Sequence, residues 1–111
     1  MTSFPVARPI TLPDRNKRAS VTLSTHEMGE GEAVVFCHGF PDIAFGWRYQ
    51  LAPVAAAGFR AIAPDQRGCG LSTVPPDVAD YGLTDLTGDL VGLLDVLDVD
   101  RAFFVGHDWG G

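Results

Sequence analysis

The residues best suited to chemistry lie at the end of the chain, in the run Gly106-His107-Asp108-Trp109-Gly110-Gly111. An acidic residue stands between two large residues, with small residues on either side, which is the pattern of a sharp strand-to-helix turn that displays a nucleophile. Gly106 and Gly110 leave room beside the strained central residue. The side chain of Asp108 is thereby directed outward, above the carboxyl end of a sheet. The pattern predicts a carboxylate nucleophile where a serine hydrolase would carry serine.

A carboxylate nucleophile suits attack on a saturated carbon better than a hydroxyl nucleophile does. Attack by serine on a saturated carbon would leave an ether, which an activated water does not readily cleave. Attack by Asp108 would leave an ester, whose carbonyl carbon accepts water, so the sequence predicts displacement at saturated carbon. The simpler interpretation is that Asp108 is a helix N-cap, a common role for aspartate. We favour the nucleophile because glycines flank Asp108 and because a second motif, His38-Gly39-Phe40-Pro41, occurs earlier in the chain.

Three apolar segments must position these motifs, namely residues 33–37, 59–63 and 102–105. The first is continuous, as is typical of a strand covered on both faces, and we interpret the last as a buried parallel strand. A loop follows each segment, and the ends of parallel strands converge on one rim of a sheet. The three loops are therefore expected to meet. They span His38–Pro41, Asp65–Ser72 and Gly106–Gly111.

The remaining elements follow from periodicity and from turn residues. Alternation over Val21–Met28 predicts a strand, and leucines at helical spacing predict an amphipathic helix with Thr84 as its N-cap and Asp85 in its first turn. Asp98-Val99-Asp100 should end that helix. Pro53 suits the first position of a shorter helix that ends before Gly58. Alternating strands and helices indicate a mostly parallel sheet with right-handed crossovers. The other expected elements are a short extended segment at Pro9–Leu12 and a helical turn within Asp42–Gln50.

Taken together, the three loops resemble those of the α/β-hydrolase fold and, more narrowly, of its epoxide hydrolase branch. The resemblance runs from about Val21 to the last residue. It implies that the backbone N–H groups of Phe40 and Trp109 form an oxyanion hole beside Asp108, and that Asp65 and Arg67 brace their loop. It also implies that the histidines next to the site place backbone and do not act as the base. The supporting motif residues are His38, Gly39, Pro41, Gly106, His107 and Gly110.

The same resemblance sets the expected organisation. Residues 1–18 would be an N-terminal extension or edge segment, and residues 19–111 the N-terminal part of an α/β-hydrolase core, truncated before the cap and the C-terminal half. The acid and the histidine follow the nucleophile in this fold, so we expect them, with the lid tyrosines, after Gly111. The 111-residue chain alone should therefore be inactive. A naturally short protein would instead leave the strand at 102–105 with an uncovered face.

Composition excludes several other classes of protein. The net charge of −6 and the scarcity of basic clusters argue against nucleic acid binding. The two cysteines, Cys37 and Cys69, are too few for a disulfide framework and favour free thiols. Neither a signal peptide nor a membrane span is evident. We expect a cytoplasmic protein that uses no cofactor and no metal ion; the sequence does not indicate its oligomeric state.

The expected function is hydrolysis of an epoxide to a vicinal diol through an ester on Asp108. The alternatives are a haloalkane dehalogenase-like hydrolase and a non-catalytic truncated fragment. Haloalkane dehalogenases typically carry Asn, whose amide helps to hold the halide, where this chain has Phe40. Fluoroacetate-type dehalogenases usually carry Arg at the position of Trp109. Both positions favour an epoxide.

Overall fold

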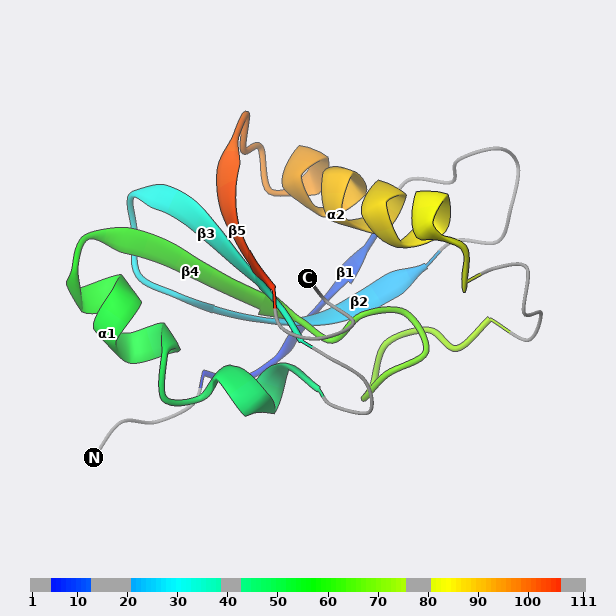
Figure 1. Cartoon of the computed structure of the whole chain (residues 1–111), viewed down its shortest axis with the longest axis horizontal. Coiled ribbons are helices and arrows are strands. Elements are labelled where there is room, and N and C mark those ends of the chain that lie inside the picture. Colours follow the sequence, from blue (N-terminus) through cyan, green and yellow to red (C-terminus); the bar gives the residue numbers. More distant parts are fainter. Residues whose placement is uncertain (1–4, 13–20, 39–42, 76–80, 107–111) are drawn as a thin grey trace.

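The computed structural model describes residues 5–12, 21–38, 43–75 and 81–106, which form a sheet with helices on both faces (Figure 1). Buried apolar runs form the central strands, and leucines at helical spacing form the longest helix. In chain order the elements are β1 (Arg8–Thr11), β2 (Thr22–Met28), β3 (Glu32–Cys37), the 3-10 helix η1 (Ala44–Trp47), α1 (Leu51–Ala56), β4 (Phe59–Pro64), α2 (Leu83–Val96) and β5 (Ala102–Gly106).

The sheet has five strands in the order β1-β2-β4-β3-β5. β3 runs parallel to both β4 and β5, whereas β2 is antiparallel to β1 and to β4. Val35 lies opposite Ile62 on one side and Phe104 on the other, and Cys37 lies opposite Gly106. The predicted α/β class is therefore confirmed. The three strands that precede the motif loops, β3, β4 and β5, form the parallel part of the sheet.

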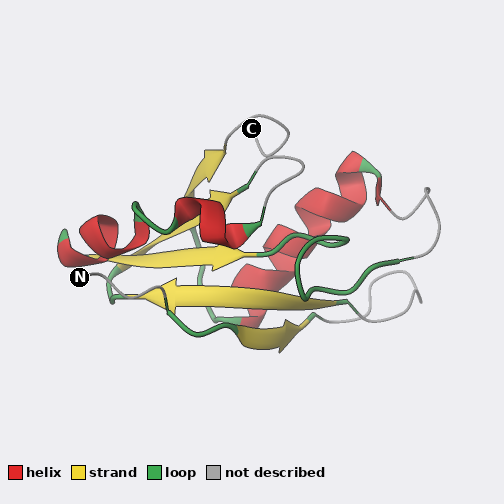
Figure 2. Ribbon diagram, turned by 90° about the horizontal axis from the view of Figure 1, so that it is seen from below, coloured by secondary structure: helices red, strands yellow, loops and turns green. Residues whose placement is uncertain are grey.

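The sheet separates two apolar clusters, because successive side chains of a strand point to opposite faces. From β3, Val34 and Phe36 pack with η1 and α1, whereas Val35 and Cys37 pack on the face covered by α2. Figure 2 shows this layering from below, with α1 and η1 in front of the strands and α2 behind them. Each fully buried large apolar side chain of these clusters stabilises the fold by about 1.5–3 kcal/mol.

The leucine stripe of α2 lies against the sheet as the spacing predicts. Leu93 is fully buried, and Leu90, Leu94 and Leu97 pack against the same cluster. The helix ends at Val96, before the Asp98-Val99-Asp100 segment that was expected to end it. Among the described helices, none has the length and apolar character that crossing a bilayer requires.

Both helices begin earlier than the sequence predicts. α1 starts at Leu51, so Pro53 is its third residue; this is tolerated because amides in a first turn have no partner inside the helix. The prediction of Thr84 as N-cap of α2 is wrong, since Gly82 occupies that position. The carbonyl of Gly82 already accepts the amides of Asp85 and Leu86, each at 3.0 Å. Asp85 lies in the first turn, as predicted.

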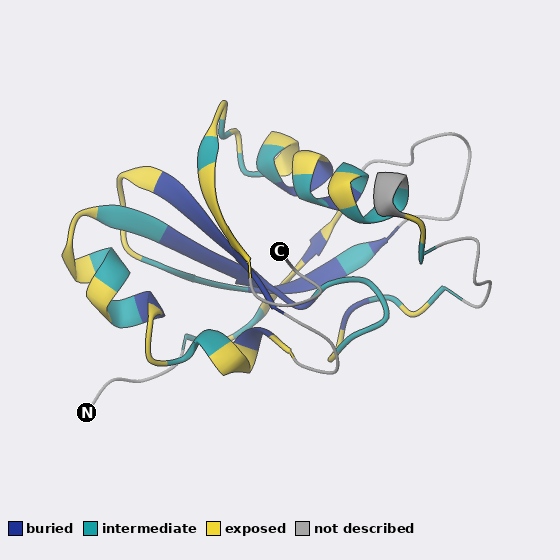
Figure 3. Cartoon of the chain, viewed as in Figure 1, coloured by how far each residue is buried: buried dark blue, intermediate teal, exposed yellow. Residues whose placement is uncertain are grey.

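β5 is parallel to β3, as expected, but the prediction that it is buried is wrong. Phe103, Phe104 and Val105 are 58%, 52% and 37% exposed. Figure 3 shows the contrast between this strand and the buried centre of the sheet. The reason is that, in the part of the chain that the structure describes, β5 lies at the edge of the sheet beside β3, and of its residues Ala102 packs against the α2 cluster. Phe103 meets Phe59 edge to face, with ring centroids 6.4 Å apart.

Candidate active site

The carboxyl ends of β3 and β5 lie side by side. Cys37, the last residue of β3, is opposite Gly106, the last residue of β5. The chain therefore enters the His38 motif and the Asp108 motif from neighbouring positions at one edge of the sheet. Of the predicted site residues, the structure describes His38 and Gly106. The others lie outside the described residues, so their roles stay predictions: Gly39, Phe40, Pro41, His107, Asp108, Trp109, Gly110.

His38 is buried and bound to the loop that follows β4. The backbone N–H of Gln66 donates to His38 Nε2 at 2.9 Å, and the Gln66 side-chain amide donates to the His38 carbonyl, also at 2.9 Å. Two of the three motif loops thus meet in the structure. An imidazole that accepts a backbone amide has its nitrogen committed to that contact, which supports a positional role for His38.

Asp65, the first residue after β4, is buried and is held through its N–H, its carbonyl and one carboxylate oxygen. Its N–H donates to the carbonyl of Ser24 at 2.8 Å, and its own carbonyl accepts the hydroxyl of Ser72 at 2.5 Å. Its carboxylate Oδ1 accepts the N–H of Ala44, the first residue of η1, at 2.7 Å. Buried polar groups need partners, and these bonds also hold the loop to β2 and to η1.

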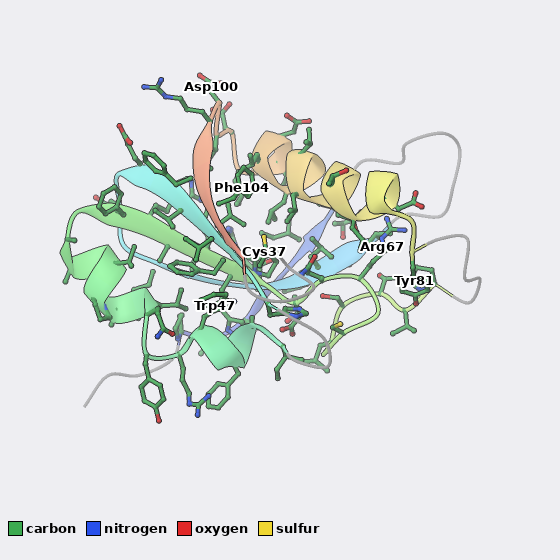
Figure 4. All side chains as sticks on the ribbon, in the orientation of Figure 1. Cys37, Trp47, Arg67, Tyr81, Asp100 and Phe104 are labelled. Atoms are coloured by element: carbon green, nitrogen blue, oxygen red, sulfur yellow. The ribbon has the colours of Figure 1, made fainter. Side chains whose placement is uncertain are left out.

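Arg67 joins the same loop to α2. Its Nε and Nη2 atoms donate to the two carboxylate oxygens of Asp89, each at 2.6 Å, and both side chains are 9% exposed. In Figure 4 the Arg67 side chain lies beside the first turns of α2. The expected bracing of the loop by Asp65 and Arg67 is confirmed. Arg67 is thereby occupied in a structural pair.

Sequence reasoning missed two residues of this arrangement, Gln66 and Asp89. Asp89 carried a usable signal, since it stands on the leucine stripe of α2, three residues after Leu86 and four before Leu93. An acidic residue on an apolar helix face predicts a buried cationic partner. Gln66 carried none, because its contacts with His38 join residues far apart in the chain.

The two thiols near the site are not competing nucleophiles. Burial raises the pKa of Cys37 from 9.0 to about 11. The pKa of Cys69 is also raised, first by burial and then by the carboxylate of Asp65. Both cysteines are free, and both stay protonated near neutral pH. Within the described ranges, no three His, Cys, Asp or Glu residues are grouped so that they could hold a metal ion.

The fold and these loops define a class of protein: an α/β protein with a catalytic-type motif at the end of adjacent parallel strands. The family model of the α/β hydrolase fold matches residues 32–111, and the chain belongs to that family. The resemblance inferred from the three loops is thereby confirmed.

Relatives and solved structures narrow the comparison. An epoxide hydrolase of Caballeronia sordidicola is 53% identical over 90 residues, which are 81% of this chain and 27% of that protein. A bifunctional epoxide hydrolase 2 of Sus scrofa is 48% identical over 94 residues, 85% of this chain and 17% of the relative. The structure of epoxide hydrolase A from Mycobacterium thermoresistibile matches with a TM-score of 0.86 and 42% identity, covering 96% of this chain and 32% of that one. The chain thus spans about a third or less of each of these proteins.

Proposed function

We propose that the whole protein containing this chain is an epoxide hydrolase, which converts an epoxide and water into a vicinal diol through an ester on Asp108. The observation that carries the proposal is the register of β3 and β5, in which Cys37 lies opposite Gly106. This register starts the His38 and Asp108 motifs from adjacent strand ends. The names of relatives that are 48% and 53% identical support the epoxide as substrate.

In the proposed reaction a carboxylate oxygen of Asp108 attacks one ring carbon. The bond between that carbon and the ring oxygen breaks, and the ring oxygen takes a proton from an acid of the whole protein. Water, deprotonated by a base, then adds to the ester carbonyl carbon. The negative charge on the carbonyl oxygen is held by the N–H groups of Phe40 and Trp109, each worth roughly 3 kcal/mol by analogy with other oxyanion holes. Collapse breaks the bond between the former carbonyl carbon and the substrate oxygen, which takes the proton of the added hydroxyl; this releases the diol and restores the carboxylate, and the proton held by the base returns to the acid.

The side chain of Phe40 supports the epoxide over a haloalkane. A departing halide is held by N–H donors, and the phenyl ring of Phe40 offers none. An epoxide has no separate leaving group, because the ring oxygen stays bound to the product. The proposed reaction therefore needs the backbone N–H of Phe40 and no polar group on its side chain.

Isotope labelling tests the proposal. With the whole protein in excess over a terminal epoxide in ¹⁸O-water, the first diol should carry no label, because its new oxygen comes from Asp108. Mass spectrometry should detect the ester on the peptide that contains Asp108, and Asp108→Asn should abolish diol formation. Asp100→Asn, at an exposed acid before β5, is the matched control and should leave turnover unchanged. Label in the first diol, or release of halide from haloalkanes without epoxide turnover, would overturn the proposal.

We propose further that residues 1–111 alone give no turnover, since the base and the ring-opening acid are not among the residues assigned in this chain. We also propose that the protein acts in the cytoplasm on a small-molecule substrate and without nucleic acid. The two free thiols and the net charge of −6 support these proposals. Activity that remains in the cytosolic fraction after nuclease treatment is the expected result.

A further inference from the structure

We propose that Asp65 and Gln66, consecutive residues at the end of β4, are positioning residues that hold both ends of the segment 39–42. The proposal deepens the proposed function and rests on it, because that segment contains Phe40, whose N–H is assigned to the oxyanion hole. His38 precedes the segment and is held by Gln66, and Ala44, the second residue after it, is held by Asp65.

The first anchor is the pair of hydrogen bonds between Gln66 and His38. One bond runs from the Gln66 backbone N–H to the imidazole, and the other runs from the Gln66 side chain to the His38 carbonyl, both at 2.9 Å. Because His38 Nε2 accepts a hydrogen, the neutral ring carries its proton on Nδ1. His38 is buried, so its loss of water contacts is offset by these partners.

The second anchor is the hydrogen bond of 2.7 Å from the Ala44 N–H to Asp65 Oδ1. Ala44 opens η1 and is fully buried. Amides in the first turn of a helix have no partner within it. A carboxylate acceptor therefore satisfies a buried donor with a charge-assisted bond, which is stronger than a bond to a neutral oxygen.

The surroundings of Asp65 fit the orientation of its carboxylate. Its backbone is bonded to Ser24 and Ser72. Its other oxygen, Oδ2, lies where a side chain on Gly70 would be, since a Cβ there would come within 2.2 Å of it. A glycine at position 70 is thus required for the orientation of Asp65 seen in the structure.

The two anchors lie on consecutive residues. The Cα atoms of Asp65 and Gln66 are about 3.8 Å apart, so His38 and Ala44, on either side of the segment, bond to neighbouring positions of one loop. Oxyanion donors must lie about 2.7–3.1 Å from the developing charge, and a displacement of about 1 Å can cost on the order of 10²-fold in rate. We call the hydrogen bonds of Gln66 with His38 and of Asp65 with Ala44 the clamp. The clamp should therefore matter most when charge develops on the ester carbonyl, that is, during hydrolysis of the ester.

Single-turnover kinetics on the whole protein separate this role from a general effect on folding. His38→Leu, which removes the acceptor of the Gln66 N–H, should slow ester hydrolysis by roughly 10- to 100-fold and leave the rate of ester formation little changed, so that the ester accumulates. His38→Gln can place an oxygen near the position of Nε2 and should restore most of the rate. Asp65→Asn, which keeps an acceptor for Ala44, should likewise lose much less than Asp65→Ala.

The outcomes distinguish the clamp from the proposed function. If the wild-type protein forms no ester on Asp108, both are overturned. If it forms and hydrolyses the ester, and His38→Leu hydrolyses it equally fast or slows both steps by one factor, the clamp alone is wrong. Long-range ¹H–¹⁵N spectra give a second test that needs no variant. A neutral His38 ring with its proton on Nε2 would contradict the first anchor.

Discussion

Removing the carboxylate of Asp89 should destabilise the protein far more than removing a charge from the surface. Asp89→Ala leaves the guanidinium of Arg67 with two lost hydrogen bonds of 2.6 Å, in a place where both side chains are 9% exposed. Breaking a buried pair from one side costs about 3–5 kcal/mol, whereas exposed pairs contribute about 0–1 kcal/mol. Because both side chains are so little exposed, we expect Asp89→Ala to lower the free energy of unfolding by about 3 kcal/mol. Alanine favours helix, so helix propensity cannot account for the loss.

The assay is urea unfolding of the whole protein, with Arg8→Ala as the matched control. Arg8 pairs with Glu27 across β1 and β2, but its side chain is 62% exposed, so its loss should cost less than about 1 kcal/mol. The double variant Arg67→Met/Asp89→Leu should recover most of the lost stability, because an apolar pair of similar volume replaces the ions. The reasoning is refuted if Asp89→Ala costs no more than Arg8→Ala, or if the double variant is less stable than the single one.

Two further predictions concern a helix end and the thiols. Asp98 follows the last turn of α2 and has a φ of 57°, and the Val99 N–H bonds to the Leu94 carbonyl at 2.9 Å. Because glycine adopts a positive φ without strain, Asp98→Gly should raise the free energy of unfolding by up to about 1 kcal/mol, and Asp98→Ala should not. Cys37 should resist iodoacetamide in the folded protein at pH 8, while Cys69 reacts slowly. Because the pKa of Cys37 is raised from 9.0 to about 11, its contribution to stability is complete below pH 9 and is lost as the pH rises toward 11, which unfolding titrations can follow.

The central strands could be predicted because a continuous run of apolar residues indicates a strand that is covered on both faces. Every residue from Ala33 to Cys37 is apolar, and every one is buried. The starts of the helices were less predictable, because they depend on which carbonyl accepts the first amides. At α2 that carbonyl belongs to Gly82, a residue without a side chain to mark it.

The motifs of the site could be predicted from the sequence, but the hydrogen bonds that hold those motifs in place could not. The spacing of glycines, His38 and Asp108 reflects local steric needs, which a single sequence reveals. The hydrogen bonds from Gln66 to His38 and from Ala44 to Asp65 join residues 28 and 21 positions apart. Such pairs leave no periodic trace. The exposure of β5 could not be predicted for a related reason, since apolar side chains on a strand do not specify which neighbours will cover them.

The two sides of the proposed site are therefore held in place by different kinds of contact. The His38 side is fixed by the hydrogen bond that Gln66 donates to His38 and by the one that Asp65 accepts from Ala44, and of these residues His38, Asp65 and Ala44 are buried. The strand that leads to Asp108 is fixed by its pairing with β3 and by the contact of Phe103 with Phe59, and its side chains are half exposed. Changes at sites without shared partners combine additively. Losses of unfolding free energy from changes at Asp65 and at Phe103 should accordingly add, because Asp65 bonds to Ala44 whereas Phe103 contacts Phe59.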